Sequence, residues 1–195
     1  MEHPEDVVRL FLKNVVGEDI ERDGTRDTPK RVVKAWKEEW GGGYSQNVSE
    51  VLTTFTDGAE GCGDEIILVS NLPVYSHCEH HLALFWGLAH IGYLPGNNIL
   101  GLSKFARVVN IFAHRLQVQE RLTNQVADAL WKHLKPKAVG VIFECRHACM
   151  ESRGVHARGS ITTTSALRGE MKTDTGLRQE FLQLVLNASS TRNGI

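Results

Sequence analysis

Residues 83–94 read ALFWGLAHIGYL, an apolar stretch of strand length that runs into the turn sequence Pro95-Gly96-Asn97-Asn98. Aromatic and branched residues bounded by a Pro-Gly turn are typical of a buried β-strand. Residues 65–70, EIILVS, precede this stretch and predict a second strand. The two strands form the first half of the expected sheet, and the elements that follow determine its class.

The segments downstream predict two helices, two strands and a last helix, at residues 103–115, 118–134, 138–145, 160–167 and 174–186. Ser103 is a possible N-cap of the first helix, Pro136 stops the second, and Asp174 caps the last. The central order is therefore β-β-α-α-β-β. Two hairpins flanking a helical pair predict an α+β domain with a largely antiparallel sheet.

Two more helices precede this unit. Residues 4–16 carry apolar side chains at helical spacing. Thr28 is the expected N-cap of a second helix, with Pro29 at its first position, and this helix ends at Gly41-Gly42-Gly43. Residues 44–63 are polar and indicate little regular structure. We therefore expect a helical segment over residues 1–43 and an α+β catalytic domain over residues 44–195, joined in one structural unit.

The overall composition argues against several classes of protein. The chain has 195 residues with 22 Lys plus Arg and 23 Asp plus Glu, a formal charge of −1. Proteins that coat duplex nucleic acid or bind membrane surfaces carry a strong positive excess. No apolar run approaches the ~20 residues of a membrane helix, and the acidic start MEHPEDVVRLF does not resemble a signal peptide. We expect a cytoplasmic protein with reduced cysteines.

Histidine and cysteine are concentrated in two short windows. Residues 77–81 read HCEHH and residues 145–149 read CRHAC, and together they hold seven of the 13 His and Cys residues. A thiolate and an imidazole three residues apart, joined by thiolates from a distant strand end, can surround one zinc ion. Four protein ligands would make a closed structural site, whereas three would leave a position for a reactive water. The additional imidazoles of His80 and His147 favour the second case, because they are suited to carry protons.

Charged residues at two predicted helix starts suggest an anionic substrate. Lys104 and Arg107 lie one turn apart in GLSKFAR, where free N–H groups favour a phosphate, although a solvated helix face would also explain them. Glu120 opens the next helix, where it either stabilises the helix dipole or accepts hydrogen bonds from a guanine-like edge. Arg153 follows the second window and would bring another cation to the metal.

Three functions from different classes fit these residues. The first is a zinc hydrolase that acts on a phosphorylated small molecule. The second is a zinc nucleobase deaminase, because His77-Cys78-Glu79 matches H-x-E; however, Cys145 and Cys149 do not match P-C-x-x-C. The third is a binding module with a closed structural zinc, which leaves the additional histidines and the basic pair unexplained.

Several segments in a fixed order resemble GTP cyclohydrolase I, namely CEHH at 78–81, GLSKFAR at 101–107, RLQVQERLTNQVADAL at 115–130, HACMESRGV at 147–155 and TTTSALRG at 162–169. TPKRVVKAW at 28–36 also fits this family. The resemblance implies the tunnelling fold and a toroidal homodecamer with active sites at subunit boundaries. It implies hydrolysis of the guanine ring of GTP at C8, release of formate and rearrangement to 7,8-dihydroneopterin triphosphate. That product serves folate, tetrahydrobiopterin and 7-deazaguanine synthesis, so the pathway stays open.

The resemblance also assigns roles to individual residues. Zinc would be held by Cys78, His81 and Cys149, and protons would be carried by His80 and His147. Ser103 would be a further catalytic residue, near the ribose during the later rearrangement. The remaining residues would bind substrate: Glu120 and Gln119 at the guanine edge, and Lys104, Arg107, Arg153 and Arg31 (from a neighbouring subunit) at the triphosphate.

Three features depart from the family pattern. Residues 82–85 read LALF, where many members have Leu-Leu-Pro-Phe. His77 and Cys145 stand where the family usually has residues that do not bind metal, and each is an alternative metal ligand or a partner for a disulfide with a neighbouring subunit.

Overall fold

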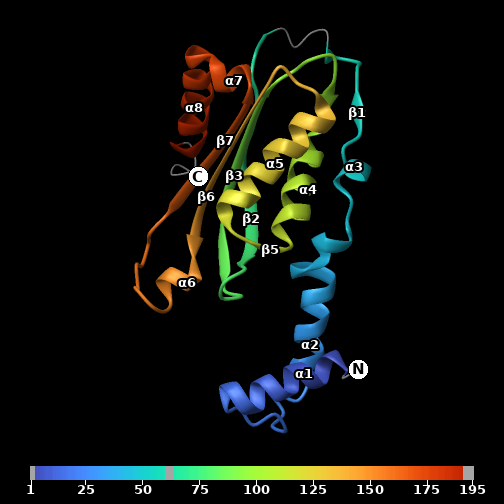
Figure 1. The fold of residues 1–195 in the computed structure, drawn as a ribbon, viewed down its shortest axis with the longest axis vertical. Helices are drawn as coiled ribbons and strands as arrows, with labels where there is room; N and C mark the ends of the chain where they lie inside the picture. The colour runs from blue at the N-terminus through green and yellow to red at the C-terminus, as the bar shows by residue number, and fades with distance from the viewer. Residues whose placement is uncertain (1–2, 60–63, 191–195) are drawn as a thin grey trace.

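The computed structural model describes residues 3–59 and 64–190. The expected order is confirmed, since the central elements along the chain are β2 (Ile67–Cys78), β3 (Leu84–Leu94), α4 (Leu102–Ala113), α5 (Gln119–Leu134), β6 (Ala138–His147) and β7 (Thr162–Gly169) (Figure 1). The short strand β5 (Leu116–Gln117) joins α4 to α5. This is the β-β-α-α-β-β order that the resemblance implies.

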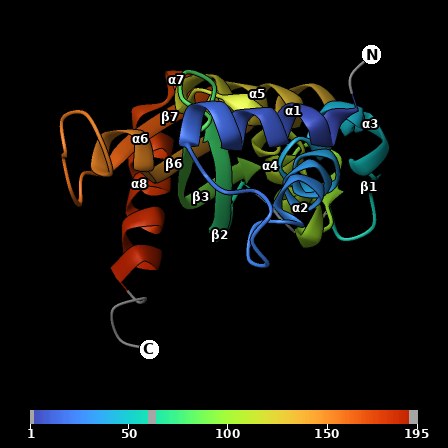
Figure 2. The ribbon, with the colours of Figure 1, turned by 90° about the horizontal axis from the view of Figure 1, so that it is seen from below.

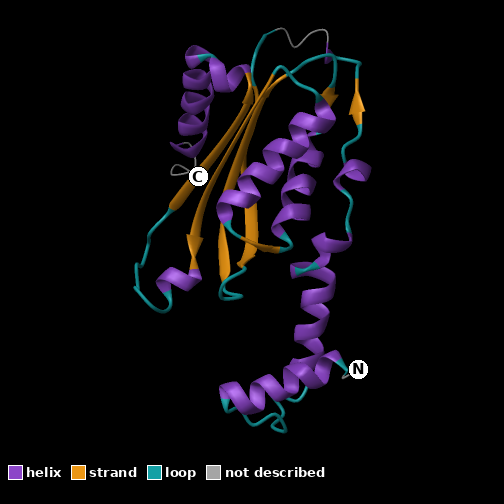
Figure 3. Ribbon diagram, viewed as in Figure 1, coloured by secondary structure: helices purple, strands orange, loops and turns teal. Residues whose placement is uncertain are grey.

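The main sheet has the strand order β5-β2-β3-β6-β7 (Figure 3). Neighbouring strands are antiparallel except for β5, which runs parallel to the end of β2. The register of β3 on β6 runs from Phe85 opposite His147 to Leu94 opposite Ala138. The end of β6 therefore lies beside the start of β3, which is where the two histidine- and cysteine-rich windows meet.

The two faces of the sheet are covered differently. Side chains alternate between faces along a strand, and on β3 the buried residues Phe85, Ala89 and Ile91 face the core beneath α4 and α5. Part of the other face is covered by α7 (Glu170–Thr173) and α8 (Thr175–Ser190), whose Phe181 is fully buried. Figure 2 shows α8 on the opposite side from the α4–α5 pair. The rest of that face is open.

The N-terminal helices form an arm below the sheet in Figure 1. The arm comprises α1 (Pro4–Phe11), η1 (Leu12–Val16), α2 (Thr28–Ala35) and η2 (Trp36–Trp40). The predicted cap of α2 is wrong by one residue, because the helix already includes Thr28 and Asp27 occupies the N-cap position. The division of the chain at residue 43 stays a prediction.

Other boundaries also differ from expectation. Strand β2 continues to Cys78 instead of ending near residue 70, and the polar stretch holds η3 (Gly42–Ser45), α3 (Val48–Val51) and β1 (Thr54–Phe55), which pairs with β4 (Ile99–Leu100). Ser103 does not cap α4, whose N-cap is Gly101. Asp174 does cap α8, since its Oδ1 accepts from Leu177 N at 3.0 Å. Within the described ranges, no helix is both long and apolar enough to cross a membrane.

Candidate active site

The turn between β2 and β3 brings one thiol and two imidazoles together. The amide of Cys78 donates to Ala83 O, and Cys78 O accepts from the amides of His81 and Leu82, at 2.8–3.3 Å. Leu82 closes this turn with φ +53°. As a result, Cys78 Sγ lies 3.8 Å from Nδ1 of His80 and 3.7 Å from Nδ1 of His81.

These distances fit a zinc ion. With Zn–S near 2.3 Å and Zn–N near 2.0 Å, a tetrahedral ion holds its sulfur and nitrogen ligands about 3.5 Å apart. The ligand atoms of Cys78, His80 and His81 all lie within 4.8 Å of one another. Both imidazoles are close enough, so the choice of His81 as ligand and His80 as proton carrier stays a prediction.

Cys149 brings a second thiol to this turn from the other window. It lies in α6 (Ala148–Glu151), directly after β6. Burial raises the pKa of Cys149, and the neighbouring Cys78 raises it further through charge and a thiol hydrogen bond, whereas Arg153 lowers it. A cation would relieve the repulsion between two thiolates, so this thiol pair suits a metal. Arg153 is exposed and close enough to act on the Cys149 charge.

An ion pair between Glu79 and Arg121, which the sequence did not indicate, links the turn between β2 and β3 to α5. Arg121 Nη1 and Nη2 donate to the two carboxylate oxygens of Glu79 at 2.5 and 2.9 Å, and the Glu79 amide donates to Gln117 O. The hydrogen bond and the charge of Arg121 lower the pKa of Glu79. The deaminase interpretation needs this carboxylate as a general acid and base. Its occupation by Arg121 argues against that function.

His147 lies at the end of β6, beside the metal-type ligands. Its ring stacks on Phe85, with centroids 4.7 Å apart and planes 13° apart, and its Nε2 lies 2.8 Å from Gln119 Oε1. Burial lowers the pKa of His147, while the exposed carboxylate of Glu120 opposes that shift. The first turn of α5 therefore places Glu120 within electrostatic reach of His147.

Four of the expected substrate residues lie elsewhere in the same chain. Ser103 and Lys104 begin α4, whose other end approaches the metal site, as Ser76 Oγ donates to Ala113 O at 2.6 Å. Ten residues of α-helix span about 15 Å, so Ser103, in the first turn of α4, lies about that far from the helix end that approaches the metal turn. Figure 1 shows α4 running along the sheet toward β5. Arg107 is exposed on the same helix, and Arg31 lies on the arm, paired with Asp27 at 3.4 Å.

The structure gives His77 and Cys145 other surroundings. The His77 ring lies between Trp36 and Trp40, with centroid distances of 4.8 and 5.0 Å. Cys145 is 1% exposed within the core, where burial raises the pKa of its thiol to about 12. In this structure Cys145 is therefore packed as a core residue, against the apolar side chains beneath α4 and α5.

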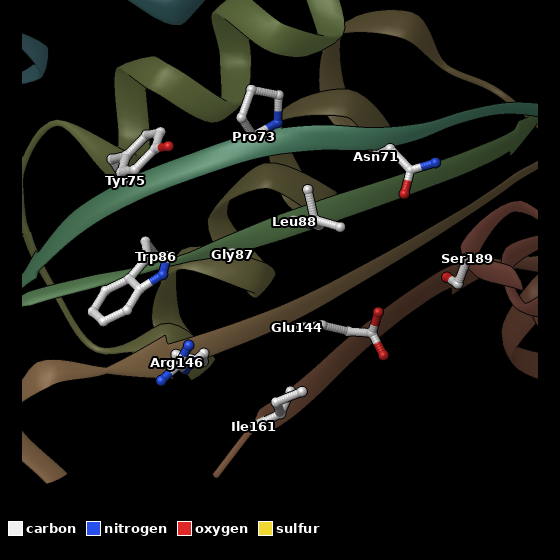
Figure 4. Close-up of a pocket in the computed structure, with 10 residues that line it drawn as sticks. All are labelled: Asn71, Pro73, Tyr75, Trp86, Gly87, Leu88, Glu144, Arg146, Ile161 and Ser189. Atoms are coloured by element: carbon white, nitrogen blue, oxygen red, sulfur yellow. The ribbon is translucent and has the colours of Figure 1, made fainter. Parts of the chain in front are cut away.

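A cavity of about 430 Å³ opens on the sheet face opposite α4 and α5. Figure 4 shows side chains of β2, β3 and β6 around it, among them Tyr75, Trp86, Glu144 and Arg146. None of the residues predicted to bind metal or substrate lines this cavity. The cavity is therefore separate from the candidate active site.

Known proteins share the sequence of this chain over most of its length. The family model described as GTP cyclohydrolase I matches residues 5–186. The chain belongs to the GTP cyclohydrolase I family. It is 58% identical to a protein named GTP cyclohydrolase 1 from Janthinobacterium sp. (strain Marseille), over 92% of this chain and 89% of that protein. A protein of the same name from Nitrosospira multiformis is 59% identical over 89% and 90% of the two chains. Another from Mycolicibacterium vanbaalenii is 51% identical over 88% and 84%.

Proposed function

We propose that this chain is a zinc-dependent GTP cyclohydrolase I, which opens the guanine imidazole ring of GTP at C8, releases formate and forms 7,8-dihydroneopterin triphosphate. One observation carries the proposal: in a member of this family, Cys78 and His81 meet at the turn between β2 and β3, Cys149 lies within electrostatic reach of Cys78, and Glu120 lies within electrostatic reach of His147. When bound, zinc supplies Lewis-acid activation of water at neutral pH. The chain's own residues supply the binding and the proton transfers.

Each residue has a role that its position supports. Glu120 is exposed at the start of α5 and can accept hydrogen bonds from the N–H and amino groups of guanine. An adenine edge would leave this carboxylate unpaired, so Glu120 selects guanine. His147 and His80 carry protons to and from the opening imidazole ring. Arg153 is placed to pair with the triphosphate.

The remaining phosphate ligands support a homo-oligomer. Ser103 and Lys104 lie in the first turn of α4, away from the helix end near Ser76, Arg107 is exposed on the same helix, and Arg31 is exposed on the arm beside Asp27. These residues would bind the ribose and triphosphate of a site that a second copy shares. We therefore propose active sites at subunit boundaries of a decamer. We also propose a cytoplasmic location, which is compatible with the free thiols of Cys78, Cys145 and Cys149.

The direct test is incubation of the purified, zinc-loaded protein with GTP, followed by assays for formate and for pterin fluorescence. We expect both products in equal amounts. Formate without a pterin would indicate an enzyme that stops after ring opening, and neither product would refute the proposed activity. Glu120→Ala should lose GTP binding and keep its zinc, whereas Glu50→Ala, an exposed carboxylate on α3, is the control. Unchanged affinity for GTP in Glu120→Ala would refute the guanine-binding role.

A second possibility has one observation in its favour. His80 Nδ1 is as near to Cys78 as His81 Nδ1 is, so Cys78, His80, His81 and Cys149 could close a structural zinc site. Zinc analysis separates the two cases. A His80→Ala protein that keeps zinc and loses turnover supports the catalytic site, whereas loss of zinc from both His80→Ala and His81→Ala supports the closed one.

A further inference from the structure

We propose that Gln119 is a positioning residue, which acts on the reaction through His147 and not through the substrate. In this role Gln119 holds the His147 ring with its Nε2 as hydrogen-bond donor and leaves Nδ1 as the acceptor available to the substrate. The proposal deepens the proposed function and rests on it for the role of His147. It replaces the expectation that Gln119 binds guanine beside Glu120.

The burial of Gln119 is the first reason. Gln119 is 1% exposed to solvent, whereas the adjacent Glu120 is exposed. The Gln119 side chain points into the interior between α5 and the ends of β6 and β7, where its amide nitrogen lies near Phe143 O and Thr162 O. A side chain that is buried, with both of its polar atoms bonded to protein, is not presented to a guanine edge.

The orientation of the Gln119 amide follows from its partners. Nε2 lies 3.1 Å from Phe143 O, 2.8 Å from Thr162 O and 3.1 Å from Thr164 Oγ1. Backbone carbonyls only accept hydrogen bonds, so the atom that faces them must be the NH₂ group. With NH₂ on this side, Oε1 is on the side of His147.

A closed chain of hydroxyl groups supports the same assignment. Thr123 Oγ1 donates to Gln119 O at 2.7 Å, and this bond uses its only hydrogen. The 2.6 Å contact between Thr123 and Thr164 therefore takes its hydrogen from Thr164. Thr164 Oγ1 is then left to accept from Gln119 Nε2. The donor is thus fixed in each of these hydrogen bonds, and together they require Gln119 Nε2 to face Thr164.

The orientation of Gln119 determines the tautomer of His147. Oε1 accepts only, so the 2.8 Å contact requires a hydrogen on His147 Nε2. In the neutral ring the other nitrogen, Nδ1, then carries the lone pair. Stacking on Phe85 restrains the plane of the ring. A reacting imidazole is thus held both in direction and in tautomer before substrate arrives.

Gln119→Met keeps the length of the side chain and removes both polar groups. We expect it to keep zinc and to bind GTP within twofold of wild type, while kcat falls about 100-fold, as for a misplaced reacting group. Thr164→Val removes one partner of the amide and should lower kcat less. Gln183→Met, an exposed glutamine on α8, is the matched control and should leave activity unchanged. A raised KM with unchanged kcat in Gln119→Met would make Gln119 a substrate ligand and overturn the proposal, and so would unchanged kinetics.

The tautomer can be measured without turnover. In ¹⁵N-histidine-labelled wild-type protein, the His147 resonances, assigned by comparison with His147→Asn, should show a protonated Nε2 and an unprotonated Nδ1 near neutral pH. The opposite tautomer would refute the proposal even if the enzyme is active. If wild-type protein produces no formate, the proposed function fails, and this spectrum still decides the state of His147. The spectrum of the wild-type protein also tests the proposal if the Gln119→Met protein does not fold.

Discussion

Replacing Phe181 by alanine removes the ring that docks α8 on the sheet. The ring rests on two glycines that face each other across the β3–β6 ladder, Gly92 and Gly140. A Cβ at Gly92 would lie 2.6 Å from the ring, and so would a Cβ at Gly140. Phe181 is fully buried, and the two glycines beneath it carry no side chains, while Met171 and Ile66 border the same space. We therefore expect a loss of about 3–5 kcal/mol, the range for buried Phe→Ala changes.

The assay is urea unfolding followed by circular dichroism at one fixed protein concentration, since assembly contributes to stability. Gly92→Ala alone should cost about 1–3 kcal/mol through overcrowding, because its Cβ would press on Phe181. In the double variant, Phe181→Ala with Gly92→Ala, the added methyl group enters the space that the ring vacates. The double variant should therefore be more stable than the sum of the single changes by about 1–3 kcal/mol.

Additive effects, within about 0.5 kcal/mol, would refute the docking of Phe181 on this glycine floor. A second readout checks that the change is local to the α8 face. The metal residues are on the other end of the sheet, and none of them touches the small cluster around Phe181. Zinc content at 25 °C should therefore equal that of wild type in the folded Phe181→Ala protein.

Three further predictions concern residues around the site. Cys149→Ser should lose zinc, as measured by elemental analysis, while Cys145→Ser should keep it; the reverse would exchange the ligand and core roles of these two thiols. Trp40→Ala removes one of the two rings against His77 and should cost about 1 kcal/mol, seen as faster amide hydrogen exchange in η2; unchanged exchange would show that this contact does not hold the arm. Burial lowers the pKa of His114 in the folded chain, so its contribution to stability is complete above about pH 6.5 and is lost as the pH falls toward the folded pKa. The free energy of unfolding should decrease over that range and decrease less in His114→Gln; equal slopes would contradict this.

Much of the candidate site was visible in the sequence because its chemistry is concentrated in short windows. Cys78 and His81 meet within one turn, so their spacing alone predicts that they can share a metal. The cap of α8 at Asp174 is equally local. By contrast, the pairing of Glu79 with Arg121 joins residues 42 positions apart, and nothing in either neighbourhood announces it.

The sequence by itself determined the order of the elements, the two windows of metal-type ligands and the family. These features depend on residue type and on spacing within a few positions. Only the tertiary structure decided which residues of the windows meet: Cys149 reaches Cys78, while Cys145 is enclosed in the core. It also separated Glu120, which faces solvent, from the adjacent Gln119, which faces His147. The reason is physical, because the register of β6 on β3 and the rotation of α5 about its axis set these directions, and both depend on packing between segments far apart in the chain.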